Sequence, residues 1–143
     1  MEPKKIDIHI DAERVSHLDS GEEGTLVGIK ILGHERLDSV YEVGYSSDSI
    51  EAKYLALIKT LEFFRDMSSE LGDVERVVIH SDCWMMVDQY RGKTELKEAK
   101  LVNMLRAVKE IQSKLKAEVR LRYIPRKENL AREILKTEKG VER

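Results

Sequence analysis

Apolar and polar side chains alternate at the start of the chain. Isoleucine occupies positions 6, 8 and 10, with polar or charged residues between them, which predicts a strand over residues 4–12 with one buried face. Four further segments are rich in apolar and β-branched residues and are bounded by turn or breaker residues such as Gly33 and Pro125, as strands are. The predicted strands are, in chain order, 4–12, 24–32, 38–46, 75–81 and 117–124.

A period of three to four residues replaces this alternation in four other segments. The longest is 95–116, where leucine, isoleucine, valine and methionine recur at helical spacing. Asp48 and Glu51 have the spacing of a capping box, which predicts that another helix begins there and runs to about residue 68. The predicted helices are 49–68, 83–90, 95–116 and 127–139.

The resulting order of elements, βββαβααβα, predicts an α/β fold. Three consecutive strands favour a meander, and the later strands alternate with helices that can cover the sheet. We therefore expect one five-stranded mixed sheet with helices on both faces. We also expect a single domain over residues 1–143, a length that is sufficient to bury a core.

Composition limits the class of protein. The uninterrupted apolar runs are only a few residues long, too short for a signal peptide or a membrane span. With Cys83 as the single cysteine, neither an internal disulfide nor a multi-cysteine metal cluster can form, which fits a reducing compartment. We expect a monomeric, cytoplasmic protein that does not bind membranes.

The formal net charge of −2 conceals a strong asymmetry. Residues 1–82 carry 9 Lys and Arg against 18 Asp and Glu, a balance of −9, whereas residues 83–143 carry 16 against 9, a balance of +7. A basic half beside an acidic half suits a nuclease, because cations bind phosphates while carboxylates bind metal ions. The alternative is a solvated surface of lysine-rich helices.

Three carboxylates lie at the ends of predicted elements. Asp11 ends the first strand, Asp82 ends the fourth, and Glu51 lies on the apolar stripe at the start of the first helix. Such strand ends are where α/β sheets place ligands. Carboxylate oxygens suit Mg²⁺ or Mn²⁺, and a bound cation would relieve the repulsion between the acids. The sequence therefore predicts a metal-dependent enzyme of phosphoryl transfer.

Each carboxylate also has an ordinary structural explanation. Asp11 is a residue type that is common in turns after a strand. Glu51 at the third helical position can stabilise the helix start through its charge. Asp82 has the position of an N-cap for the helix that begins at Cys83. None of the three acids is decisive alone.

Taken together, three segments resemble the type 1 ribonuclease H family. Residues 49–57 (SIEAKYLAL) and 80–93 (HSDCWMMVDQYRGK) are similar to the second and third catalytic segments of that family. Residues 124–129 (IPRKEN) are similar to the segment that precedes its last catalytic acid. The resemblance implies a ribonuclease H-like fold and an endoribonuclease that hydrolyses the RNA strand of RNA/DNA hybrids with two Mg²⁺ or Mn²⁺ ions.

Carried over by motif, the resemblance implies a set of four metal-binding, catalytic acids. The first three are Asp11, Glu51 and Asp82, and the fourth, counted as four positions after Asn129, is Glu133. If the family's segment is instead aligned on Ala131 of the last helix, Arg132 takes the position of the fourth acid and the site has only three acids. Candidate substrate-binding residues near these segments are Ser46, Ser47, Trp84, Arg91 and Lys93.

The chain departs from the family at the first acid. The family usually has Asp-Gly and then a glycine-rich turn, whereas here Ala12 follows Asp11 and the next glycine is Gly21. This departure favours an alternative of a different class, a degenerate module of the same fold that binds nucleic acid or protein without cleaving it.

Overall fold

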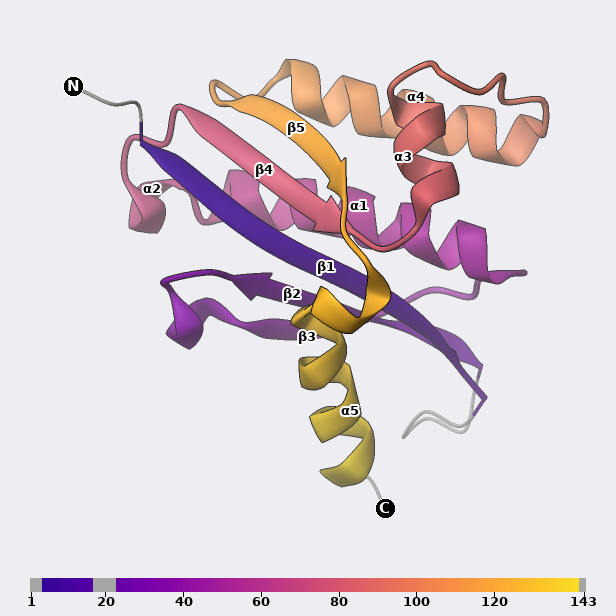
Figure 1. Cartoon of the computed structure of the whole chain (residues 1–143), viewed down its shortest axis with the longest axis horizontal. Coiled ribbons are helices and arrows are strands. Elements are labelled where there is room, and N and C mark those ends of the chain that lie inside the picture. Colours follow the sequence, from indigo (N-terminus) through magenta and orange to yellow (C-terminus); the bar gives the residue numbers. More distant parts are fainter. Residues whose placement is uncertain (1–3, 17–22, 142–143) are drawn as a thin grey trace.

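The computed structural model describes residues 4–16 and 23–141, and within them five strands form one mixed sheet (Figure 1). The order across the sheet is β3-β2-β1-β4-β5, with β1, β4 and β5 parallel to one another and β2 antiparallel to both of its neighbours. The predicted five-stranded mixed sheet is therefore confirmed. The strands are β1 (Lys5–Val15), β2 (Gly24–Ile31), β3 (Ser39–Val43), β4 (Arg76–Ser81) and β5 (Glu118–Tyr123).

Helices lie on both faces of this sheet, as predicted (Figure 1). α1 packs on β1 and β2 and is covered by α4, while α5 packs on β1, β2 and β3 from the opposite face. None of the helices in the described residues is long and apolar enough to cross a membrane. The helices are α1 (Ser49–Asp66), α2 (Ser68–Leu71), α3 (Trp84–Tyr90), α4 (Ala99–Ser113) and α5 (Ala131–Val141), with single 3₁₀ turns η1 (Glu35–Leu37) and η2 (Arg126–Glu128).

The main core lies between the sheet and α1. Ile6, Ile8 and Ile10 are all buried on that side of β1, in agreement with the alternation in the sequence. The residues between them face α5 and the uncovered part of the sheet, because side chains of a strand alternate between its two faces. Leu57 and Leu61 of α1 complete the same cluster.

β1 continues beyond the point where β4 leaves it. The parallel pairing of β1 with β4 ends at His9 and His80, whereas its pairing with β2 continues from Ile8 to Val15. The expectation that Asp11 ends the first strand is therefore wrong. Asp11 lies inside β1, just beyond the end of its pairing with β4. From there on, β1 has β2 on one side and an opening on the other, where the described residues supply no paired strand. Asp82, which directly follows β4, lies across that opening.

The last helix begins at Ala131, four residues later than predicted. η2 intervenes after Pro125, and the side-chain oxygen of Asn129 accepts the Ala131 N–H at 3.0 Å, which starts the helix at that residue. Leu130 is 42% exposed instead of lying on the apolar face, and its N–H donates to His9 Nδ1 at 3.1 Å. This register decides which side chain of α5 reaches the opening beside β1.

Close packing of α5 on the sheet depends on Gly28 of β2. A Cβ atom at this position would lie 3.0 Å from Leu135 Cγ and 3.1 Å from the carbonyl oxygen of Ala131. The bare backbone of Gly28, which pairs with Asp11 in β1, therefore lets the first turn of α5 approach the strand that carries the predicted first acid.

Candidate functional site

Two of the predicted acids, Asp11 and Asp82, share one lysine. Lys53 from α1 hydrogen-bonds the Asp11 carboxylate, lies 3.8 Å from Asp82 Oδ1 and donates to the carbonyl oxygen of Ala12 at 3.0 Å. All three charged side chains are largely buried, with 8% of each carboxylate and 18% of the lysine exposed. A largely buried ammonium thus lies between the two acids where β1 and β4 separate and offsets one of their two negative charges.

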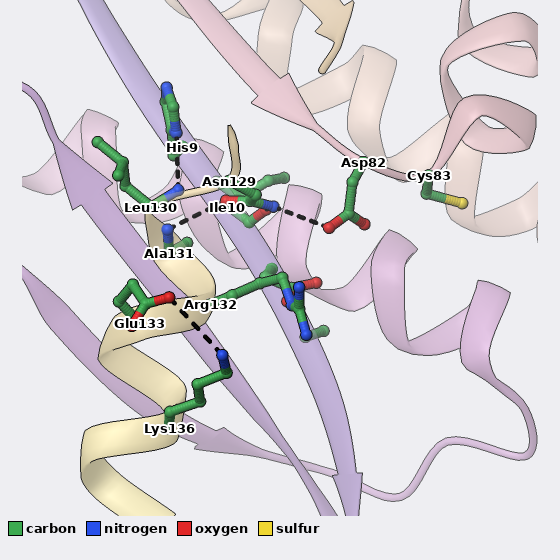
Figure 2. Close-up of polar contacts among 12 residues, drawn as sticks. His9, Ile10, Asp82, Cys83, Asn129, Leu130, Ala131, Arg132, Glu133 and Lys136 are labelled. Carbon is green, nitrogen blue, oxygen red and sulfur yellow. Dashed lines mark hydrogen bonds and ion pairs between the residues drawn. The ribbon is translucent and has the colours of Figure 1, made fainter. Parts of the chain in front are cut away.

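Asp82 is held by Asn129 and does not cap a helix. The N-cap of α3 is Cys83, whose N–H donates to Ser81 Oγ at 3.1 Å. Asn129 Nδ2 donates to Asp82 Oδ2 at 3.2 Å and to the carbonyl oxygen of Ile10 at 2.9 Å, so it joins β1, the end of β4 and the start of α5 (Figure 2). The capping explanation of Asp82 is therefore wrong.

Arg132, and not Glu133, is the residue of α5 that approaches the acids. Arg132 Nε lies 3.9 Å from Asp11 Oδ2. Glu133 is turned away toward Lys136, 3.7 Å from its ammonium, and its side chain is 71% exposed (Figure 2). Of the two alignments of the last helix, the structure agrees with the one based on Ala131, in which Arg132 occupies the fourth position. Glu133 does not lie near the predicted cluster.

Glu51 points to a different set of partners. Its N–H donates to Asp48 Oδ1 at 2.9 Å, as expected for a helix start. Its buried carboxylate accepts hydrogen bonds from the backbone N–H and hydroxyl of Ser47 and lies 2.8 Å from Lys100 Nζ. Burial acts to raise the pKa of Glu51, but the bonds from Lys100 and Ser47 prevail and hold it below its ordinary value.

We expect Glu51→Gln to lower the free energy of unfolding by about 1–2 kcal/mol at pH 7, because hydrogen bonds to a charged group are lost. A depressed pKa in the folded state stabilises the fold above the unfolded pKa, and this stabilisation disappears as the pH falls below about 4. Thermal melts from pH 7 to 3 should therefore show the two proteins converging at acid pH. Glu110→Gln, which alters an exposed pair with Lys114, is the control and should have little effect; a deficit for Glu51→Gln that persists at pH 3 would contradict this role.

The four predicted acids therefore do not form one metal-binding cluster. Among residues 4–16 and 23–141, no group of three or more His, Cys, Asp or Glu side chains is placed to hold a metal ion. Burial raises the pKa of the Asp11 carboxyl, and the Lys53 ammonium offsets this only in part. The charge on Asp11 and Asp82 is instead balanced by Lys53 and Arg132, which approach from helices on opposite faces of the sheet.

A groove of about 430 Å³ opens beside Lys53 and Asp82. Trp84, which is 60% exposed, lies on it together with Arg14 and Arg126. Trp84 is therefore a surface residue and not part of the core. An exposed indole next to several cations is an arrangement that can stack on a base and bind phosphates.

The other predicted substrate-binding residues lie apart from this groove. Ser46 is buried, and its hydroxyl lies 2.7 Å from Thr25 Oγ1. Ser47 is engaged by Glu51, whereas Arg91 donates to the carbonyl oxygen of Leu121 at 3.1 Å. Lys93 is exposed beyond the end of α3. Of the five predicted residues, Trp84 is the one that lines the groove.

A comparison with protein families places the chain. The family model described as "Reverse transcriptase-like" matches residues 32–135. The chain belongs to the reverse transcriptase-like family. No curated protein matches it by sequence.

Solved structures of the ribonuclease H fold are similar to this reverse transcriptase-like chain. A type 1 ribonuclease H isolated from compost by a metagenomic approach, solved in complex with an RNA/DNA hybrid, is 24% identical, with a TM-score of 0.73 over 90% of this chain and 91% of that one. The type 1 enzyme of Halobacterium salinarum is 17% identical, with a TM-score of 0.68 over 93% and 98% of the two chains. The predicted ribonuclease H-like fold is confirmed.

Lys53 is a residue of this reverse transcriptase-like site that the sequence analysis missed. Lys53 follows Glu51 by two positions, about 200° around a helix, so both cannot face β1. The sequence does contain an indication. Ala56, Leu57 and Thr60 follow Lys53 at the spacing of one helix face, and the structure buries that face. For the fourth position the sequence offers both Glu133 and Arg132, and the choice between them depends on where α5 begins, which is set by a side-chain hydrogen bond of Asn129.

Proposed function

We propose that this domain binds nucleic acid in the groove beside Lys53 and Trp84, and that it does not cleave it with metal ions. The observation that carries the proposal is the Lys53 ammonium bound between Asp11 and Asp82. This corresponds to the alternative that the sequence left open, a non-cleaving module of the ribonuclease H fold.

The electrostatics of the acid pair support the absence of metal ions. A divalent cation between Asp11 and Asp82 would lie next to the ammonium of Lys53 and would be repelled strongly, because the site is largely buried. Arg132, the side chain on the α5 side, has no lone pair to offer a metal, since its guanidinium is always protonated. These residues do not fit a two-metal centre, and we derive no step through one.

The groove supplies groups for binding without cleavage. Arg14 and Arg126 can contact phosphates, and the exposed face of Trp84 can stack on a base or sugar. We propose an RNA/DNA hybrid as the ligand, because the similar compost enzyme was solved with one.

A second candidate function is metal-dependent cleavage of the RNA strand at the same place. It is favoured by the proximity of Asp11 and Asp82 to one common cation. With Glu51 and Glu133 they would supply the four predicted acids, but Lys53 would have to withdraw and both glutamates would have to leave their present partners. The proposed function and this candidate therefore differ in their response to metal.

The deciding experiment measures the melting temperature of the protein and its binding and cleavage of a labelled RNA/DNA hybrid, with millimolar Mg²⁺ or Mn²⁺ and with EDTA. We expect hybrid binding in both conditions, no cleavage and no metal-dependent shift in the wild type. Lys53→Glu would place three carboxylates together, so its melting temperature should rise with Mn²⁺. At ten times the dissociation constant the gain is about 1.4 kcal/mol, or about 4 °C.

A matched variant separates a specific effect from general charge reversal. Lys136→Glu makes the same change at an exposed position that contacts Glu133, and it should gain no metal response. Metal-dependent hydrolysis of the hybrid by the wild type, abolished by Asp82→Asn, would refute the proposed function in favour of the second candidate.

A further inference from the structure

The outer side of β5 carries a row of arginines that the proposed groove does not use. Along β5, Val119 and Leu121 are buried, while Glu118, Arg120 and Arg122 are exposed. β5 is an edge strand of the sheet, and α5 packs on β1, β2 and β3 (Figure 1). The exposed side chains of β5 therefore lie on a part of the sheet that α5 leaves open.

The strand register brings further cations beside this row. In the parallel pairing, Lys5 of β1 is level with Arg76 of β4, which is level with Glu118 of β5. Residues level with one another in neighbouring strands point to the same face. Lys5, Arg76, Arg120 and Arg122 therefore share one face, and together with Arg91 from the end of α3 they line a hollow of about 470 Å³, which we call the basic hollow.

The charge of the basic hollow is only partly balanced. Glu118 accepts from Arg76 Nε and from Arg120 Nε, both at 3.0 Å, and Asp7 lies 3.7 Å from Lys5 Nζ. Two carboxylates thus face five cations. The described residues give the Arg122 side chain neither a hydrogen bond nor an ion pair. A ligand with several negative charges would supply the missing balance.

The free edge of β5 also argues against a protein strand as the ligand. Arg91 Nη2 donates to the carbonyl oxygen of Leu121 at 3.1 Å. This side chain occupies an acceptor that an added strand would need for its own ladder of hydrogen bonds, and charged side chains are a known protection of edge strands. The basic hollow thus offers side-chain donors to a ligand and not a backbone edge.

We propose that the basic hollow binds the phosphate backbone of a single-stranded nucleic acid. The proposal rests on the nucleic-acid function proposed above and adds a second contact surface to it. β5 leads directly from Arg122 through a short connection to Arg126, which lines the groove beside Lys53. A strand leaving the groove can therefore continue along Arg122 and Arg120. A hollow of about 470 Å³ can hold part of one strand but not the full width of a duplex.

The test is fluorescence anisotropy of a labelled single-stranded 20-mer across a salt series. Arg120→Glu/Arg122→Glu should weaken binding about tenfold or more near 0.1 M salt and should reduce the slope of log K against log salt by about 1.4, because two phosphate contacts are lost. Glu118→Gln removes the carboxylate that pairs with Arg76 and Arg120 and should instead tighten binding. The control Arg36→Glu/Arg106→Glu makes the same change in net charge at exposed positions outside the hollow.

The outcomes separate this inference from the proposed function when Trp84→Ala is measured in parallel. A loss of affinity in the β5 variant well beyond that of the control supports the basic hollow, whether or not Trp84→Ala also loses affinity. Equal, small losses in the β5 and control variants, with a large loss in Trp84→Ala, would overturn the hollow and leave the groove standing. No binding of the single-stranded 20-mer by the wild type would overturn the hollow, whereas the groove would be overturned only by a failure to bind the RNA/DNA hybrid. Competition by polyglutamate as effective as that by unlabelled nucleic acid would overturn the nucleic-acid assignment in favour of an acidic protein ligand.

Discussion

Replacing Lys53 with methionine should lower the free energy of unfolding at pH 7 by about 3–5 kcal/mol, because removing one partner of a buried ion pair leaves the other charge uncompensated. Here two carboxylates, Asp11 and Asp82, depend on the same ammonium, and the carbonyl oxygen of Ala12 loses its donor as well. The measurement is chemical denaturation followed by circular dichroism.

The size of this loss should depend on pH in a defined direction. Burial already raises the pKa of Asp11, and removing Lys53 raises it further. A carboxyl whose pKa is higher in the folded state binds more protons there, so the variant loses stability as the pH rises through the interval between the unfolded and folded values. The deficit should therefore be smaller at pH 4 than at pH 7.

Two variants make the test specific. Lys136→Met removes a lysine from an exposed pair with Glu133 and should cost less than about 1 kcal/mol. Asp11→Asn combined with Lys53→Met removes one of the uncompensated charges and should recover part of the loss. If Lys53→Met were no less stable than Lys136→Met, the buried charge balance would not be what holds this site.

Asn129→Ala should cost about 3 kcal/mol at any pH between 6 and 8, since a buried side chain that makes three hydrogen bonds is removed. The Ile10 carbonyl and the Ala131 N–H would be left without these partners, and Asp82 would lose its amide donor. Each unsatisfied buried group costs on the order of 1–3 kcal/mol. Denaturation with urea measures the change, and amide exchange of α5 should increase with it.

The chain contains a matched control for this substitution. Asn103 lies exposed on α4, where its side-chain oxygen is 3.4 Å from Arg106 Nη1. Asn103→Ala should change the stability by less than about 0.5 kcal/mol. Similar small values for both asparagines would show that α5 is held by its apolar contacts alone.

The fold could be predicted from the sequence because its periodicities are strong. Isoleucines on one face of β1 and the helical spacing of α4 each reflect a single buried face, and the structure confirms both elements. The ends of the elements were less certain. The extension of β1 to Val15 depends on pairing with β2, and the late start of α5 depends on Asn129, so neither follows from local preference.

The site could be predicted only in part, because charge compensation is a property of three-dimensional contacts. Asp11 and Asp82 lie together as expected, since both belong to the place where β1 and β4 separate. The partners of Glu51 and Glu133 could not be read from spacing, because a one- or two-residue shift around a helix exchanges an acid for Lys53 or Arg132. The cations that complete the site therefore became visible only with the side chains in place.

Gly28 links the packing of this protein to its electrostatics. Any larger residue would press against Leu135 and the Ala131 carbonyl and lift the first turn of α5 from the sheet. Arg132, the next residue of that turn, would move away from Asp11, although no charged group had been altered. Selection on the charge of the site thus acts also on an uncharged position in a neighbouring strand. In comparisons among relatives, residue size at position 28 should therefore vary together with the residue at position 132.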